Sequence, residues 1–335
     1  MVQEATDALP VFCYKMRCLQ GQGSHLSLVR VPKGVRGVFV SLTHRLSADR
    51  SSWRIFLLGI LVFWLAGCSS LVEKGGSRLA NSLTAAVLNN NDPAIVEAGL
   101  PTYLLLMDAL ALQEPKSPMI QQAAASLTSA YAGAFVKDPA RIAALTEKSR
   151  SYALTALCQQ YEKLCNIREM PVDELKKALE ELDDKEEDVP PLYTLGTTWA
   201  SWIDAHSSDF NAVADLPRVE AILQRVLALD ENYQQGMTHL YMGVIATAIP
   251  PALGGRPEIG KAHFEKAIAL SQGHNLMAKV YFAKNYARGI YDRELHDKLL
   301  AEVIETPAEA NGWTLTNLLA KKEAKALQES ADDFF

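Results

Sequence analysis

The stretch IPPALGGRPEIGKAHFEKAIALSQGHNLMAKVYFAKNYAR, residues 249–288, contains a helix-ending loop, one amphipathic helix and the start of a second helix. Apolar or small side chains, mostly three or four residues apart, occur between 259 and 270 at Ile259, Ala262, Phe264, Ala267, Ile268 and Leu270. This spacing places them on one face of an α-helix. The same spacing occurs in 222–229 and 299–304, so the sequence predicts a repeated helix.

Each of these helices is paired with a helix in which a large residue precedes a small one. The doublets are Leu195-Gly196, Met242-Gly243 and Phe282-Ala283. A small residue lets a second helix approach closely, as in tetratricopeptide repeats. The doublets lie 47 and 40 residues apart, against roughly 34 in a standard repeat, so we expect the additional residues in loops.

The sequence therefore predicts an all-α protein of tetratricopeptide-like helix pairs that form an α-solenoid or helical bundle. We expect a helical part over residues 77–190 and a repeat part over 191–335. Trp313 and residues 315–327 would form a terminal helix that caps the repeats. The charge-rich segment 173–188 ends at Pro190-Pro191 and is expected to be a solvated helix end and linker, with a partner-binding acidic patch as the alternative.

The charges are divided unevenly along the chain. Residues 1–67 hold eight Lys/Arg and three Asp/Glu, whereas residues 68–335 hold 25 and 36. An acidic body excludes a general nucleic-acid-binding role, because binding to phosphates requires a basic face.

A leader precedes the body. Residues 55–66, IFLLGILVFWLA, are an apolar run that follows Arg45, Arg50 and Arg54, which is the order of a secretory signal peptide. The run is shorter than the roughly 20 residues of a membrane-spanning helix. A leader of residues 1–67 exceeds the usual 15–30 residues. We therefore expect a signal peptide over about 40–67, with translation starting near residues 40–46.

The residues Leu65-Ala66-Gly67-Cys68 resemble the lipobox of bacterial lipoproteins. The resemblance implies that Cys68 receives a diacylglycerol on its sulfur before the leader is removed, and that the new amino terminus is acylated. Two or three acyl chains hold a protein stably at a membrane. Residues 68–76 would then be a lipidated tether. The alternative is a buried cysteine after an apolar helix.

Three helix starts have a polar N-cap followed by proline: Asp92-Pro93, Ser117-Pro118 and Asp138-Pro139. They predict helices over 94–113, 119–136 and 140 to about 165, the first of them kinked or broken at Pro101. On one such helix, the Cα atoms of Cys158 and Cys165 would be about 10.5 Å apart, beyond the reach of a disulfide. We therefore expect both cysteines to be small core residues.

The segment LPRVEAILQRVLALDENYQQG, residues 216–236, and the segment 242–288 resemble the T components of tripartite ATP-independent periplasmic (TRAP) transporters. The resemblance extends to LPTYLLLMDAL (100–110) and to residues 124–136, and so covers most of 79–305. Its most specific part is the Pro-x-x-x-Gly-Gly loop before His263-Phe264.

This resemblance implies a lipid-anchored periplasmic body that binds the solute-binding (P) component. It also implies a homotrimer and a cleft or channel that passes small hydrophobic ligands. The polar residues after Cys68 favour the outer membrane over the inner one. The alternative function is a structural tetratricopeptide adaptor lipoprotein in envelope assembly.

Two groups of residues are candidates for binding a ligand or partner. Aromatic side chains on or near the first helix of each pair are Trp199, Trp202, Tyr241, Tyr281 and Tyr286. They offer flat apolar surface with a polar edge, and the alternative for each is a place in the core between repeats. The loop residues Pro251, Gly254 and Gly255 could form a rim for a ligand or partner.

No pattern in the sequence points to catalysis. The histidines of the body, His206, His239, His263, His274 and His296, lack the spacing of a metal site. There is no G-x-S-x-G elbow, and no lysine followed by serine or threonine comes after Gly255 at the spacing of a phosphate-binding loop. We therefore expect a binding protein that is not an enzyme and needs no metal or cofactor.

Overall fold

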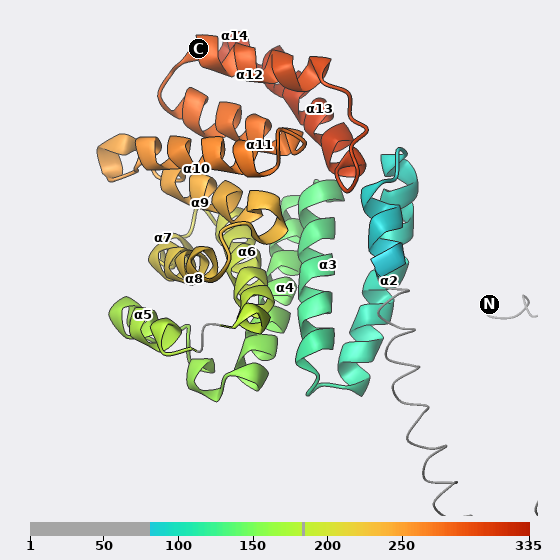
Figure 1. The fold of residues 1–335 in the computed structure, drawn as a ribbon, viewed down its shortest axis with the longest axis vertical. Coiled ribbons are helices and arrows are strands. Elements are labelled where there is room, and N and C mark those ends of the chain that lie inside the picture. The colour runs from blue at the N-terminus through green and yellow to red at the C-terminus, as the bar shows by residue number, and fades with distance from the viewer. Residues whose placement is uncertain (1–80, 183–184) are drawn as a thin grey trace, which may run out of the picture. The chain divides into compact units, whose positions relative to one another are not determined.

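The computed structural model describes residues 81–182 and 185–335, in which every regular element is helical, as predicted (Figure 1). Helical residues 81–88 are followed by α2 (Pro93–Gln113), α3 (Pro118–Phe135), α4 (Pro139–Gln160), η1 (Glu162–Leu164) and α5 (Val172–Glu180). The expected leader over 1–67, the lipidation residue Cys68 and the tether over 68–76 lie outside the described residues.

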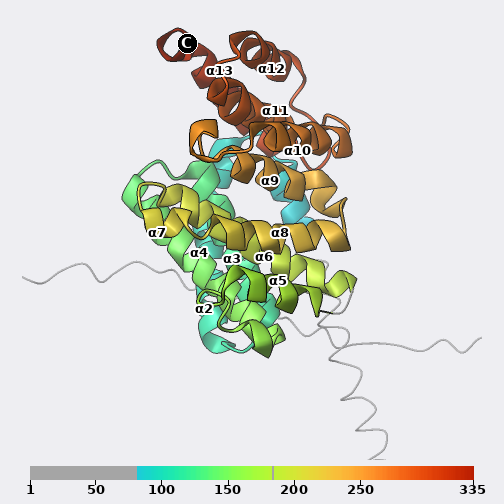
Figure 2. The same cartoon turned by 90° about the vertical axis from the view of Figure 1, so that its left-hand side faces the viewer.

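The remaining helices lie between residues 186 and 334. They are η2 (Glu186–Asp188), α6 (Val189–Ala205), α7 (Phe210–Val213), α8 (Leu216–Leu229), η3 (Tyr233–Gly236), α9 (Met237–Thr247), η4 (Pro251–Leu253), α10 (Pro257–Leu270), α11 (Leu276–Tyr281), η5 (Phe282–Ala287), α12 (Arg293–Glu305), α13 (Thr314–Glu329) and α14 (Ala331–Phe334). Neighbouring helices pack in pairs, such as α6 with α8, α9 with α10, and α12 with α13 (Figures 1 and 2). The helix η5 is a π-helical turn that continues α11.

The doublets let paired helices pack closely, as expected. A Cβ atom on Gly196 of α6 would lie 2.5 Å from a methyl carbon of Leu223 on α8. A Cβ on Gly243 of α9 would lie 2.8 Å from the ring of Phe264 on α10. Because real Cβ contacts are not that short, a larger residue at either position would force Leu223 or Phe264 to move.

The three predicted helix starts are confirmed. The Asp92 carboxylate accepts hydrogen bonds from the backbone N–H groups of residues 94 and 95, and Ser117 and Asp138 accept the N–H of the residue three positions on. A side-chain oxygen thus satisfies a free amide in each first turn. The helix α2 continues through Pro101, so the break expected there is absent.

The helix α2 lies at an edge of the bundle, beyond α3 (Figure 1). Only Val96, Leu100 and Ala111 of its 21 residues are buried. It is the one helix in the described ranges that is long and apolar enough to cross a membrane. Val96 and Leu100 nevertheless belong to a core cluster with Tyr131 and Leu315, so one face of α2 is part of the folded body.

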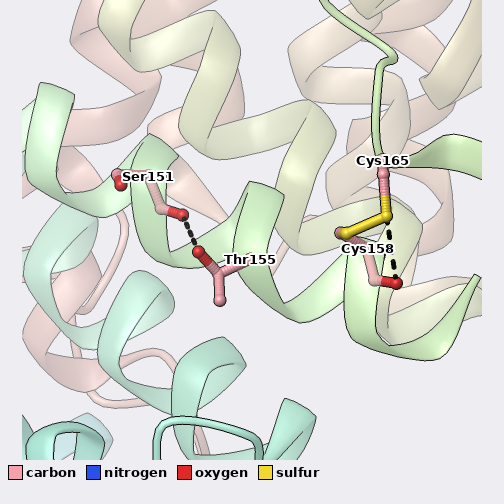
Figure 3. The surroundings of a disulfide bond; sticks show 4 residues. All are labelled: Ser151, Thr155, Cys158 and Cys165. Atoms are coloured by element: carbon pink, nitrogen blue, oxygen red, sulfur yellow. Dashed lines mark hydrogen bonds between the residues drawn. A yellow bond between two sulfur atoms is a disulfide. The ribbon is translucent and has the colours of Figure 1, made fainter. Parts of the chain in front are cut away.

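The expectation for the cysteines was wrong: Cys158 and Cys165 form a disulfide, with their Cα atoms 4.3 Å apart (Figure 3). The reason is that α4 ends at Gln160 and not near residue 165. Tyr161 has extended backbone dihedrals, and the short turn η1 returns the chain to the end of α4. Neither cysteine is a core residue, since Cys158 is half-buried and Cys165 is exposed.

The acidic segment is also more structured than the expected solvated linker. Its helix α5 packs against α8 and buries Leu175 and Leu179. At its end, Asp188 is buried and accepts a hydrogen bond from the Tyr161 hydroxyl. Part of the acidic run is therefore packed against the core, because its leucines recur at helical spacing.

Candidate functional site

A hollow of about 390 Å³ lies beside the glycine loop that the sequence singles out. Its lining comes from α7, α8, the end of α9 and the loop that leads into α10, and includes Phe210, Leu216, Pro217, Ile249, Gly254 and Gly255. The exposed residue Pro251 precedes the two glycines in the same loop. Residues about 40 positions apart in the sequence thus meet at one mostly apolar site.

The loop conformation depends on its glycines. The Pro250 carbonyl accepts hydrogen bonds from the N–H groups of Leu253 and Gly255, and Gly254 has a φ of 97°. A Cβ atom on Gly255 would lie 1.7 Å from the carbonyl oxygen of Ile249. Since that contact is with backbone, no side-chain movement could relieve it. Glycine is therefore required for the tight fold of the loop.

An ion pair at the rim fixes the loop to α8. The Arg256 guanidinium donates two hydrogen bonds to the Glu220 carboxylate, at 2.9 and 2.7 Å. These bonds raise the pKa of Arg256 above its ordinary value. Two parallel hydrogen bonds also hold the guanidinium in one orientation. The hollow therefore combines an apolar floor with one oriented charge pair.

Two large apolar side chains project beside the hollow. Phe210 is 90% exposed at the start of α7, and Leu253 is 74% exposed in η4. A large apolar residue with so little contact contributes almost nothing to the stability of the isolated chain. Exposed apolar groups next to an apolar hollow are typical of an interaction surface.

The predicted tyrosines lie elsewhere, on the first helices of the repeats. Tyr241 of α9 is half-buried, and its ring centroid lies 6.4 Å from that of Tyr193, which in turn lies 5.0 Å from that of Tyr233. Burial raises the pKa of Tyr241 to about 12 and also raises the pKa of Tyr281. These phenols therefore stay neutral at physiological pH and can donate hydrogen bonds.

Tyr286 is buried and its hydroxyl donates to Glu258 at 3.0 Å, which ties the π-helical turn to α10. This contact gives Tyr286 a structural role in the described part of the chain. Whether the tyrosines also bind a ligand stays a prediction.

The two predicted tryptophans lie in and against the core. Trp199 is fully buried and its indole N–H donates to Asp215 at 3.2 Å. Trp202 is half-buried, and the central carbon of the Arg150 guanidinium lies 3.5 Å from its ring centroid. The ring of His206 also stacks on Trp202, with the centroids 4.6 Å apart. Sequence reasoning missed Arg150 because helical spacing alone does not show that α6 covers it.

Two of the five histidines are in contact. The Nδ1 atoms of His239 and His263 lie 2.8 Å apart, and Nε2 of His239 lies 3.5 Å from the carboxylate of Glu231. Burial lowers the pKa of both, that of His263 to about 4. Within residues 81–182 and 185–335, no three His, Cys, Asp or Glu side chains are grouped so that they could hold a metal ion. The pair is therefore a neutral hydrogen-bonded contact at physiological pH.

Comparison with known proteins identifies the family. Residues 89–335 match the family model described as TRAP transporter T-component. An uncharacterized protein of Treponema pallidum (strain Nichols) is 24% identical over 271 residues, which cover 75% of this chain and 83% of the relative. The matched family is one of periplasmic transporter accessory components and not of enzymes. Because the model covers most of the chain, this protein belongs to the T-component family of TRAP transporters.

Proposed function

We propose that this T component binds a periplasmic solute-binding protein through the surface around the glycine loop. The observation that carries the proposal is the apolar hollow beside the exposed side chains of Phe210 and Leu253. Apolar anchors that fill pockets supply most of the energy of protein interfaces. The charge pair of Glu220 and Arg256 at the rim would orient the partner.

The proposal has further parts that rest on the family and on the leader. The chain is anchored by lipid at Cys68, with the outer membrane favoured, and its copies associate, as a trimer. Small hydrophobic ligands pass between the T component and its partner. The half-buried tyrosines Tyr241 and Tyr281, with Trp202, are the candidate contacts for such a ligand, because they present rings with a polar edge.

The partner surface can be tested with one substitution and a matched control. Leu253→Lys places a charge beside the hollow, whereas Leu105→Lys makes the same change at a leucine of α2 that is exposed to a similar degree, 70%. Titration calorimetry with the solute-binding protein of the same envelope should show a Kd at least about tenfold weaker for Leu253→Lys. The Leu105→Lys control should have the same Kd, expressed per chain, as the unaltered protein. Equal affinities for all three chains would refute this surface.

A further inference from the structure

A contact between two histidines holds α9 against α10. The Nδ1 atoms of His239 on α9 and His263 on α10 lie 2.8 Å apart, and the ring centroids are 5.0 Å apart. His239 is 7% exposed and His263 is half-buried. At this distance one Nδ1 donates a hydrogen bond and the other accepts it. The contact therefore exists only while at least one of the two Nδ1 atoms carries no proton.

Acid breaks this contact for a geometric reason. A single added proton can go to an Nε2 atom and leave the Nδ1 contact intact. When both rings are imidazolium, however, both Nδ1 atoms carry a hydrogen. Two N–H groups would then point at each other over 2.8 Å, and both rings would carry the same charge. His239 and His263 must therefore move apart once both are protonated.

Charged side chains face the pair from the segments packed around it. On the side of His239, Glu231 in the turn after α8 lies 3.5 Å from Nε2. Glu231 also forms an ion pair with Lys266 of α10 at 3.1 Å, so its negative charge is shared. On the other side, Glu220 of α8 and Arg256 of the glycine loop act on His263 with opposite signs.

Glu220 and Arg256 form the ion pair at the rim of the hollow, so the histidine pair is linked to the loop by charge. A positive charge on His263 attracts Glu220 and repels Arg256. It therefore competes with Arg256 for the carboxylate. Protonation of His263 thus weakens the two hydrogen bonds that fix the loop to α8.

Packing gives a second link, because the glycine loop connects α9 to α10, which lie side by side (Figure 2). Near the loop, a Cβ atom on Gly260 would lie 2.5 Å from a methyl carbon of Thr247. At the loop itself, the Arg256 N–H donates to the Ala246 carbonyl at 2.9 Å. Close-packed elements transmit a displacement to their neighbours. Separation of the two histidines therefore displaces the loop.

We propose that the His239–His263 pair makes partner binding at the glycine loop sensitive to pH. At neutral pH the pair holds α9 on α10, and the Arg256–Glu220 ion pair keeps the loop in the conformation that the partner binds. In acid, charge on the histidines separates the helices and weakens the ion pair, and the partner is released. This inference rests on the proposed partner surface and adds its regulation.

Burial sets the size of the expected effect. It holds the pKa of His263 at about 4, against an ordinary value of 6.5, and also lowers the pKa of His239. If His263 regains its ordinary pKa when the loop opens, the equilibrium shifts toward the open loop by roughly 20-fold between pH 7 and pH 5. The pair should therefore weaken partner binding about tenfold over this range.

The test is titration calorimetry of the full chain with the solute-binding protein of the same envelope, at pH 7 and pH 5. The ratio of the two Kd values is compared between chains, so that any titration of the partner itself cancels. The ratio for the unaltered chain should exceed that for His263→Gln by about tenfold. The control His274→Gln makes the same substitution at an exposed histidine outside the pair and should keep the ratio of the unaltered chain.

Equal ratios for the unaltered chain and His263→Gln would overturn the inference and leave the partner surface standing. A lost pH effect in His274→Gln would also overturn it, because any change of charge would then suffice. No binding by the unaltered chain at pH 7 would overturn the partner surface and the inference together. Thermal unfolding at both pH values checks that each chain is folded.

Hydrogen exchange supplies a measurement that needs no variant. The amides of Gly255 and Arg256 donate to the carbonyls of Pro250 and Ala246. Their protection in the unaltered chain, corrected for the intrinsic exchange rate, should fall about tenfold from pH 7 to pH 5. Equal protection at the two pH values would overturn the inference, even if His263→Gln does not fold.

Discussion

Cys158 and Cys165 are joined by a disulfide across the turn that ends α4, with their Cα atoms 4.3 Å apart. Disulfides persist in oxidising compartments such as the periplasm, which agrees with the envelope location of the T-component family. The bond closes a short loop that fixes where η1 leaves α4. It therefore restrains the turn that leads into the acidic helix α5.

Replacing both cysteines with serine should lower the free energy of unfolding by about 2–3 kcal/mol, because a cross-link between residues seven apart restricts the unfolded chain. Urea unfolding of the full chain measures this difference. Dithiothreitol should destabilise the unaltered protein by the same amount and leave the double variant unchanged. A midpoint of the unaltered protein that does not respond to reductant would contradict the bond.

The contact between Arg150 and Trp202 should be measurable as a coupling energy. The Arg150 side chain is 2% exposed, and this burial lowers the pKa of Arg150. Its guanidinium forms an ion pair with Glu147 at 2.8 Å. A desolvated cation over an indole ring is worth about 2 kcal/mol. A double-mutant cycle with Arg150→Met and Trp202→Leu should therefore give a coupling free energy of about 1–2 kcal/mol. Additive effects would show that the ring does not stabilise the charge.

The two loop glycines should respond differently to alanine. Gly254→Ala meets open space and should cost only the strain of a positive φ, about 1 kcal/mol. Gly255→Ala forces a Cβ against the Ile249 carbonyl, so the loop backbone must move and the loss should be clearly larger. Denaturant unfolding of both variants compares them directly. Equal losses would mean that the loop is not folded tightly on Ile249.

The histidine pair should make stability depend on pH below neutrality. Burial holds the pKa of His263 at about 4, against an ordinary value of 6.5, so the unfolded chain takes up the proton first as the pH falls. The contribution of neutral His263 to the free energy of unfolding is therefore complete above pH 6.5 and is lost as the pH falls from 6.5 to about 4. The charged side chains that act on the pair are those of Glu231, Lys266, Glu220 and Arg256.

The control is His263→Gln, which keeps a polar side chain and cannot be protonated in this range. Its thermal midpoint should fall less steeply between pH 6.5 and 4 than that of the unaltered chain. Parallel pH profiles for the two proteins would exclude His263 as a cause of the acid sensitivity.

Local sequence signals predicted most of the fold. The caps Asp92, Ser117 and Asp138 accept hydrogen bonds from amides at most three residues on. The small residues Gly196 and Gly243 mark where a neighbouring helix packs closely. Such features are visible in sequence because their cause is local or repeated. The helix pairs followed from them and are confirmed. The family resemblance rested on the segments 216–236 and 242–288 and is also confirmed.

The remaining features depend on tertiary structure. The end of α4 at Gln160 has no glycine or proline to mark it, so the return of Cys165 to Cys158 was missed. The loop glycines predicted a rim for a ligand or partner. Phe210 and Glu220, which line the same hollow, precede the glycines by more than 30 positions and belong to another helix pair. Side chains that meet across such distances leave no periodic signal.

The proposed partner of this T component is a periplasmic solute-binding protein. The most direct measurement is affinity capture of the full chain from its own envelope extract, followed by mass spectrometry of the bound proteins and of extracted small molecules. A periplasmic solute-binding protein should be recovered with the unaltered chain and with Leu105→Lys, and should be lost with Leu253→Lys. Recovery of envelope-assembly or cell-wall factors, with no solute-binding protein, would refute the proposed partner and favour the adaptor function.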